Sequence, residues 1–198
     1  MSKGDETRQA ILDEATRVAS RVGLQGLTIG ALAAQTRLSK SGLFAHFRSK
    51  EALQVQVLEH AAAMFVDGVL RPALAAPRGE PRVRELFERW LAWCGGTWPG
   101  GDLFVAAAAE LDDEPGPVRE RLVRAQRDWL ETIANVFRTG ITEGQFRADA
   151  DPEQFAHDLY GVVLAYHHAR RLLRDPAAER RARLALDRLL DDARPPRH

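Results

Sequence analysis

A short segment at residues 39–47, with the sequence SKSGLFAHF, carries side chains that could bind a polyanion. Projected as a helix at about 100° per residue, the segment turns Leu43 and Phe47 toward one side. The opposite side holds Ser41, Phe44 and Ala45, with Lys40 at its margin. A cation and a hydroxyl group can hydrogen-bond to base edges or phosphates, and an aromatic ring can contact the thymine methyl group. Such a face is typical of a helix that reads the major groove of DNA.

A second short helical pattern precedes this segment, and the two together predict a helix-turn-helix. Only the four residues 36–39 separate the two patterns. Thr28 and Ser39 are good N-caps for the two helices, because a hydroxyl oxygen can accept a hydrogen bond from an otherwise unpaired amide. The apolar side chains that can face one small core are Leu32, Ala33, Leu38, Leu43 and Phe47.

Further candidate contacts to phosphate lie at the edges of this motif. Thr28 and Lys50 stand at predicted helix starts, where backbone amides and a side chain can bind phosphate together. His46 falls off the base-reading side and is assigned to phosphate. Residues 1–50 hold eight basic and four acidic side chains, whereas the whole chain has 28 of each. A basic N-terminal part therefore precedes an acidic remainder, which favours contact between the first part and a polyanion.

Helical periodicity continues along the chain, and no alternating β-branched run appears. Ala, Leu, Arg and Glu dominate, and these are strong helix formers. The first helical pattern ends at Gly23, in a C-cap position. The sequence predicts an all-α protein of about nine helices, with a three-helix helix-turn-helix domain at residues 1–49 and a helical domain at residues 50–198. Later helices are expected at residues 50–72, 83–94 and 102–111. A long helix then runs to about residue 140, and the last two are expected at residues 152–174 and 176–192.

The chain has one cysteine, Cys94, so no internal disulfide bond can form and a reducing compartment fits best. The N-terminus is charged and lacks the apolar segment of a secretion signal. No apolar run approaches the roughly 18–20 residues that a membrane span needs. We therefore expect a cytoplasmic protein with no membrane partner, and we expect no cofactor or metal.

The segment LTIGALAAQTRLSKSGLFAHFRSKEAL resembles the DNA-binding signature of tetracycline-repressor-like (TetR-family) transcriptional regulators. The resemblance covers residues from about 7 to 58. It places Thr28, Ser39, Lys40, Ser41, Phe44, His46 and Lys50 where members of the family contact DNA. Two positions depart from the family pattern. Arg37 stands where glycine is common and could add a phosphate contact, and Phe44 stands where tyrosine is common.

The resemblance also implies that the second domain binds a small molecule and forms a homodimer. Aromatic side chains in the middle helices would suit an apolar or aromatic effector. The candidate effector contacts are Met64, Phe65, Trp90, Trp93, Cys94, Phe104, Trp129, Phe137 and Tyr166. Aromatic residues at helical spacing are also common in an ordinary core, and this alternative stays open.

The last two helices carry more apolar residues than one face needs, so two copies could form a four-helix bundle. The candidate interface residues are Phe155, Leu159, Val162, Val163, Leu186, Leu189 and Leu190. The alternative is that these helices simply pack on their own domain. A dimer implies a palindromic operator. An effector that binds better to a form whose recognition helices do not match the spacing of the operator would lower the affinity for DNA and release the protein. Repression is the commonest outcome in the family.

Two other classes of function compete with this interpretation. An enzyme in a helical bundle is disfavoured, because Cys94 lies on an apolar stripe and no nucleophile elbow, phosphate loop or carboxylate cluster is present. Glu153 and His157 share a helical face, but two ligands are too few for a zinc site. A sequence-indifferent architectural DNA binder would be more basic than this balanced chain. Lysine, serine and histidine on a surface helix are also often only solvated.

Overall fold

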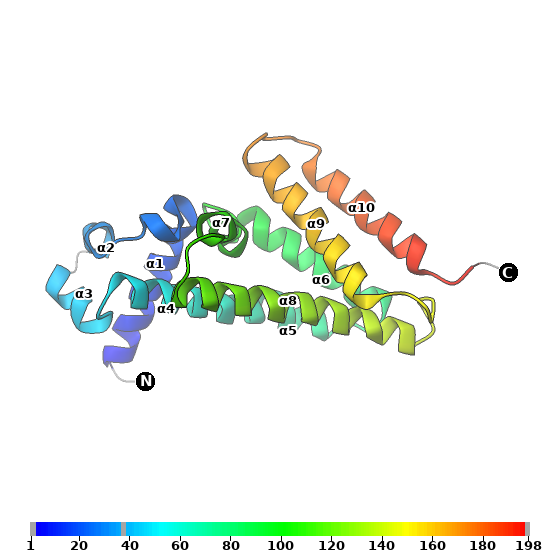
Figure 1. Cartoon of the computed structure of the whole chain (residues 1–198), viewed down its shortest axis with the longest axis horizontal. Helices are drawn as coiled ribbons and strands as arrows, with labels where there is room; N and C mark the ends of the chain where they lie inside the picture. The colour runs from blue at the N-terminus through cyan, green and yellow to red at the C-terminus, as the bar shows by residue number, and fades with distance from the viewer. Residues whose placement is uncertain (1–2, 37–38, 197–198) are drawn as a thin grey trace. The chain divides into compact units, whose positions relative to one another are not determined.

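The computed structural model describes residues 3–36 and 39–196, and these are mostly helical (Figure 1). No β-strand occurs in the part of the chain that the structure describes. The predicted all-α fold is therefore confirmed. Among these residues no helix is long and apolar enough to cross a membrane. The chain forms two compact units, one of residues 1–65 with 96–125 and one of residues 66–95 with 126–198.

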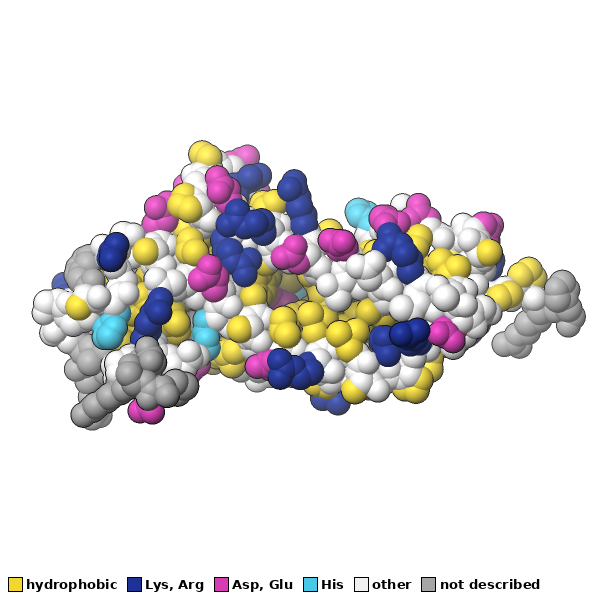
Figure 2. Space-filling model, turned by 90° about the horizontal axis from the view of Figure 1, so that it is seen from below, with side chains coloured by type: hydrophobic (Ala, Val, Ile, Leu, Met, Phe, Trp, Pro, Cys, Tyr) yellow, Lys and Arg dark blue, Asp and Glu magenta, His cyan; other side chains and the backbone are white. Residues whose placement is uncertain are grey.

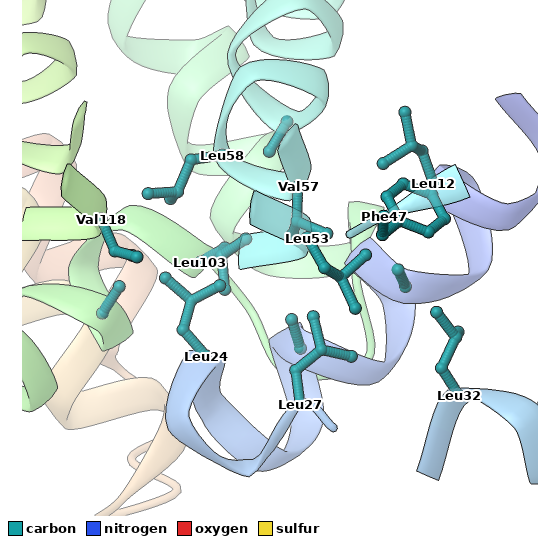
Figure 3. Close-up of a cluster of buried hydrophobic side chains, with 14 of the residues drawn as sticks. Leu12, Leu24, Leu27, Leu32, Phe47, Leu53, Val57, Leu58, Leu103 and Val118 are labelled. Atoms are coloured by element: carbon teal, nitrogen blue, oxygen red, sulfur yellow. The ribbon is translucent and has the colours of Figure 1, made fainter. Parts of the chain in front are cut away.

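The first unit contains the predicted helix-turn-helix. Its helices are α1 (Lys3–Gly26), α2 (Ile29–Thr36), α3 (Lys40–His46), α4 (Lys50–Phe65), α7 (Leu103–Leu111) and the first part of α8 (Pro117–Thr142). Its core draws on all of them: Figure 3 shows Leu12, Leu24, Leu27, Leu32, Phe47, Leu53, Val57, Leu58, Leu103 and Val118 gathered in one cluster. Because α2 and α3 are far shorter than the roughly 12–15 residues that an isolated helix needs, this shared core must stabilise them.

The two predicted N-caps are present. The Thr28 hydroxyl oxygen accepts a hydrogen bond from the Ala31 amide at 3.0 Å. The Ser39 hydroxyl oxygen accepts one from the Gly42 amide, also at 3.0 Å. Each bond satisfies an amide that has no partner inside its helix, and such a cap stabilises a helix by about 1 kcal/mol. The two hydroxyl groups therefore fix where α2 and α3 begin.

Polar side chains join α4 to α1 along one side. The Arg8 guanidinium donates to Gln56 Oε1 at 2.6 Å. The ring of His60 is largely buried and lies between Gln9 and Asp13, with Nδ1 3.0 Å from the Gln9 amide nitrogen and Nε2 2.7 Å from an Asp13 carboxylate oxygen. If the Gln9 nitrogen donates to Nδ1, the histidine proton sits on Nε2 and donates to Asp13. These contacts fix the register of α4 on α1.

The second unit contains the rest of the chain. Its elements are the π-helical turn η1 (Val66–Leu70), α5 (Arg71–Leu74), α6 (Glu80–Ala92), the rest of α8, α9 (Pro152–Arg171) and α10 (Ala178–Ala193). A second π-helical turn, η2 (Trp93–Thr97), continues α6 to the point where the chain returns to the first unit. The helices α9 and α10 run side by side in opposite directions (Figure 1). The last two helices lie within two residues of their predicted starts.

The compact units do not coincide with the predicted domains at residues 1–49 and 50–198. Helix α4, helix α7 and the first turns of α8 pack with the helix-turn-helix, so the first unit is larger than residues 1–49 and is discontinuous in sequence. The chain passes between the units three times, after residues 65, 95 and 125. A division of function at residue 50 stays a prediction.

A network of ion pairs joins α6 to the end of α10 in the second unit. Arg194 donates to both carboxylate oxygens of Glu80, at 2.5 and 2.9 Å. Arg84 donates to Glu80 at 2.8 Å and to Asp187 of α10 at 2.7 Å. These hydrogen bonds, with Arg194 first, lower the pKa of the Glu80 carboxyl group below its ordinary value. The carboxylate therefore stabilises the fold above pH 4.5 and loses this contribution as the pH falls through its lowered pKa.

We predict that Glu80→Gln lowers the free energy of unfolding by about 1 kcal/mol at pH 7, because two charge-assisted contacts to Arg194 are weakened. The difference from the unsubstituted protein should shrink as the pH falls below 4.5, where the carboxyl group becomes protonated. Urea denaturation followed by circular dichroism at several pH values measures this difference in the free energy of unfolding. Glu85→Gln is the control, because Glu85 pairs with Arg89 on the same helix. Equal, pH-independent losses in both variants would contradict the prediction.

Candidate DNA-binding surface

Helix α3 separates a buried side from an exposed one. Leu43 and Phe47 have no exposed surface, whereas Lys40 and Ser41 are exposed. This is the division that the helical projection predicts. Phe44 lies in α3, but its side chain is outside the described residues, as are Arg37 and Leu38 in the preceding turn. The described polar residues of α3 can therefore meet a ligand without disturbing the core.

The two serines at the start of α3 have different roles. The Ser39 hydroxyl caps the helix and lies 3.0 Å from the Ser41 hydroxyl. Because a hydroxyl oxygen has two lone pairs and one proton, Ser41 keeps hydrogen-bonding capacity for a base edge or a phosphate. Ser39 thus fixes the helix start and orients Ser41, which remains at the exposed surface.

Lys40 of α3 and Thr28, the N-cap of α2, both lie beside Gly30 in the first turn of α2. A Cβ atom added to Gly30 would lie 3.6 Å from Lys40 Cε, 3.9 Å from Lys40 Nζ and 3.9 Å from the Thr28 hydroxyl oxygen. The lysine side chain therefore extends from α3 across the first turn of α2. An ammonium group, a hydroxyl group and the amides at a helix N-terminus together suit an anion such as a backbone phosphate. We call this group of Thr28, Gly30 and Lys40 the phosphate anchor.

Two further predicted phosphate contacts, His46 and Lys50, have partners inside the protein. The ring of His46 is half-buried, with its centroid 6.1 Å from that of Phe47. The Lys50 ammonium group donates to the backbone oxygen of Gln25 at 2.7 Å. This bond could not be expected from the sequence, since Gln25 is uncharged and lies on a different helix. Lys50 has two further N–H donors, so the contact leaves it able to reach a phosphate.

Charge is mixed over the molecular surface. Figure 2 shows lysine and arginine side chains interspersed with aspartate and glutamate on the face that it draws. The formal net charge of the whole chain is zero. The charge excess of residues 1–50 is therefore a local feature, and binding to a polyanion would depend on a few placed cations such as Lys40.

The predicted effector contacts divide between the two units. Met64, Phe65 and Phe104 belong to the first unit. The other predicted contacts belong to the second unit and are all buried: Trp90, Trp93, Cys94, Trp129, Phe137 and Tyr166. The nine predicted residues therefore belong to two separate groups, one in each unit.

The second unit brings part of its group into one aromatic cluster. The rings of Trp90 and Trp129 meet edge to face with their centroids 4.8 Å apart. Tyr160 stacks on Trp90 at 5.8 Å, and its hydroxyl group donates to Gln126 at 2.8 Å. Tyr160 is a residue that the sequence prediction missed, although it is aromatic and lies in the helix predicted at residues 152–174. We call Trp90, Trp129 and Tyr160 the aromatic cluster.

Phe137 has a different role from the aromatic cluster. Its ring stacks between Phe146 and Phe155, with centroid distances of 4.4 and 4.1 Å. All three rings are nearly completely buried. This arrangement is that of an ordinary hydrophobic core, which favours the core alternative for Phe137.

Tyr166 stands at a polar edge of the second unit. Burial raises the pKa of its hydroxyl group above the ordinary value, so the group remains protonated at neutral pH. The Arg170 guanidinium donates to the backbone oxygen of Gly95 at 2.8 Å. A Cβ atom added to Gly95 would lie 3.4 Å from the Tyr166 hydroxyl oxygen. A tyrosine, an arginine and the chain beside Cys94 thus lie close together.

The predicted interface residues mostly face the interior of the second unit. Phe155, Leu159, Val163, Leu186 and Leu190 are at most 6% exposed, and Val162 and Leu189 are half-buried. The exposed apolar residues on the same helices are instead Leu164, at 39%, and Leu184, at 44%. Between α9 and α10 lies a groove of about 360 Å³, whose lining includes Gly161, Ala165 and Ala169 from α9 and Ala178, Ala182 and Ala185 from α10.

Comparison with known proteins identifies the class of protein. The model described as "Bacterial regulatory proteins, tetR family" matches residues 11–57. The model described as "Tetracyclin repressor-like, C-terminal domain" matches residues 79–186, which is more than half of the chain. The chain therefore belongs to the TetR family of transcriptional regulators, and the resemblance seen in its helix-turn-helix segment is confirmed. The family consists of DNA-binding regulators rather than enzymes.

Similar individual proteins agree with this class. The chain is 28% identical over 156 residues to the HTH-type transcriptional repressor DhaR of Mycobacterium sp. strain GP1, covering 77% of this chain and 76% of that protein. A TetR-family regulator from Cytophaga hutchinsonii is 21% identical, with 100% and 99% of the two chains covered and a TM-score of 0.86. AibR, solved with isovaleryl coenzyme A and operator DNA, is 21% identical, with 96% and 99% covered and a TM-score of 0.73.

Proposed function

We propose that this regulator is a repressor that binds a palindromic operator as a homodimer and is released by a small apolar or aromatic effector. The phosphate anchor is the observation that carries the proposal. It combines a cation, a hydroxyl group and a helix N-terminus at the edge of a helix whose polar side is exposed. The name of DhaR, a repressor, and the operator DNA bound to AibR support the same conclusion.

Each predicted DNA contact has a place in this proposal. Ser41 and Phe44 lie opposite Leu43 and Phe47 in the helical projection of α3 and would contact base edges. Thr28 and Lys40 would hold a backbone phosphate at the start of α2 and set the register of α3 in the groove. Arg37, Ser39, His46 and Lys50 would add contacts at the margins of the motif.

We predict that selection from a randomised pool of duplexes enriches a palindromic motif with half-sites about 34–36 Å apart, one turn of DNA. Lys40→Gln should bind this motif more weakly at every salt concentration. The affinity should also depend less steeply on salt. In a plot of log K against log salt concentration, each phosphate that the variant no longer neutralises makes the slope about 0.9 less negative. A dimer loses two such contacts, so its slope should be about two units less negative. Fluorescence anisotropy over a salt series measures both quantities. Enrichment of no motif, or equal slopes for the two proteins, would contradict the proposal.

The dimer would form through the exposed side of α9 and α10. Gly161, Ala165 and Ala182 lack bulky side chains, which allows a helix of a second copy to approach closely along the groove. Leu164 and Leu184 beside it are exposed and would become buried. The proposed interface therefore keeps the predicted helices but uses their outer side, since the inner side already forms the core of the unit.

We predict that Ala165→Glu converts the dimer to a monomer, because it would place a carboxylate from each copy in an apolar interface. Sedimentation velocity at micromolar protein concentration measures the change. Ala148→Glu is the matched control, since Ala148 is exposed in the segment between α8 and α9. A variant that remains dimeric, or an unsubstituted protein that is already monomeric, would rule out this interface.

The effector would bind in the second unit near the aromatic cluster. Its tryptophan and tyrosine rings would supply apolar surface, and the Tyr166 hydroxyl and Arg170 would supply polar groups from the same unit. AibR, a protein of the same fold, was solved with isovaleryl coenzyme A, which supports a compound with a short acyl chain as a first candidate. An effector that prefers one conformation would shift operator affinity by a coupling energy of ~1–3 kcal/mol.

We predict that compounds that change the tryptophan fluorescence also release the labelled operator over the same range of concentration. A series of aromatic and branched short-chain acyl compounds of increasing size is the first set to test, with isovaleryl coenzyme A as one further member. Trp129→Phe should shift both titrations together, because loss of the indole ring removes apolar surface from the cluster. A compound that changes the fluorescence at saturation but leaves operator binding intact would argue against this site as the effector site.

A further inference from the structure

The turn that joins α1 to α2 is fixed by the core of the first unit. The backbone of α1 leaves helical geometry at Gly23, which has φ 81° and ψ 165°. The Leu27 amide then donates to the Leu24 oxygen at 3.2 Å, which closes a turn. The side chains of Leu24 and Leu27 are completely buried (Figure 3). The remaining polar groups of this turn need other partners, and they find them on α4 and α7.

Two side chains of α4 bind the carbonyl groups of this turn, and one residue of α7 binds its amide. Gln54 donates to the Leu24 oxygen at 2.5 Å, and Lys50 donates to the Gln25 oxygen at 2.7 Å. From α7, a carboxylate oxygen of Glu110 accepts the Gln25 amide at 2.9 Å. The Glu110 backbone oxygen accepts the Gln25 side-chain amide at 3.0 Å. Helix α7 therefore binds Gln25 through both the side chain and the backbone of one residue.

Close packing fixes the segment of residues 100–111 against α1 at both ends. A Cβ atom at Gly23 would lie 2.3 Å from a Glu110 carboxylate oxygen. At the other end, a Cβ atom at Gly100 would lie 1.3 Å from the backbone oxygen of Ser20. At Gly100 the neighbouring atom is backbone, so this position needs glycine. At Gly23 a Cβ atom would displace the Glu110 carboxylate, and the positive φ itself favours glycine. The carboxylate of Glu110 thus has a defined place beside the turn.

We propose that Glu110 is a positioning residue for DNA binding. It acts through Gln25, whose amide it holds, to fix the turn that leads directly into Thr28 and the first turn of α2. That turn carries the phosphate anchor, so a displacement of Gln25 would move Thr28 away from the ammonium group of Lys40. This inference rests on the proposed binding of an operator, and it assigns α7 a role in that binding.

The direction in which DNA affinity changes when Glu110 is removed distinguishes a positioning role from long-range electrostatics. Removing an acidic side chain makes the protein more positive, which by long-range attraction alone strengthens binding to DNA. The positioning role requires the opposite result at Glu110. The positioning role also requires that operator affinity depends on salt as steeply as in the unsubstituted protein, because Glu110 does not itself contact a phosphate. A general charge effect would appear equally at Asp113, which is exposed in the loop after α7.

The experiment compares full-length Glu110→Ala with Asp113→Ala on the selected operator, by fluorescence anisotropy at several salt concentrations. We expect Glu110→Ala to bind about tenfold more weakly, the effect of losing one charge-assisted hydrogen bond. Its salt slope should equal that of the unsubstituted protein, and Asp113→Ala should bind as well or slightly more tightly. Glu110→Gln keeps an acceptor oxygen at the same place and should retain most of the affinity. Thermal unfolding by circular dichroism verifies that each variant is folded.

A second comparison uses Gly23→Ala, whose Cβ atom would displace the Glu110 carboxylate from its place beside the Gln25 amide. This substitution should cost less operator affinity in the Glu110→Ala background than in the unsubstituted protein, because only the cost of a positive φ remains. Equal costs in the two backgrounds, or a Glu110→Ala protein that binds as tightly as the unsubstituted one, would overturn the inference. Failure of the unsubstituted protein to enrich any duplex would instead overturn the proposed function, so the two failures are distinguishable.

Discussion

Burial of Leu43 and Phe47 is the constraint on which the DNA-binding unit depends. Helix α3 has seven residues and cannot persist alone in water, so it exists only because these two side chains are packed into a core. Packing them fixes the rotation of α3, and that rotation exposes Lys40 and Ser41. The same apolar contacts that hold the fold therefore decide which polar side chains are offered to a ligand.

Much of this unit could be predicted from local sequence, because its signals act over a few residues. Thr28 and Ser39 mark the helix starts by capping amides three residues away, and their bonds are present as expected. Helical spacing identified Leu43 and Phe47 as core residues. The resemblance to the TetR family added what spacing could not, namely that a helix-turn-helix of this pattern belongs to a transcriptional regulator.

Features that depend on distant parts of the chain were not predictable in this way. Nothing near Glu110 indicates that it binds Gln25, 85 residues earlier, because a glutamate at a helix end is usually solvated. Lys50 was assigned to phosphate, yet its ammonium group also holds the turn after α1. On α9 and α10 the apolar residues form a stripe on each helix. The sequence could not show that Leu159 and Leu190 meet their own unit whereas Leu164 stays exposed.

The discontinuous first unit provides a physical reason why DNA binding and the state of the rest of the protein can be linked. Residues 1–49 alone lack Leu53, Val57 and Leu103, which complete the core around α1 and α2 (Figure 3). The DNA-binding unit therefore needs separate stretches of chain, and the chain crosses into or out of the other unit at three points. If an effector binds the second unit as proposed, its preference for one conformation would act through these three connections. The stability of the turn before Thr28 would then contribute to the affinity for DNA.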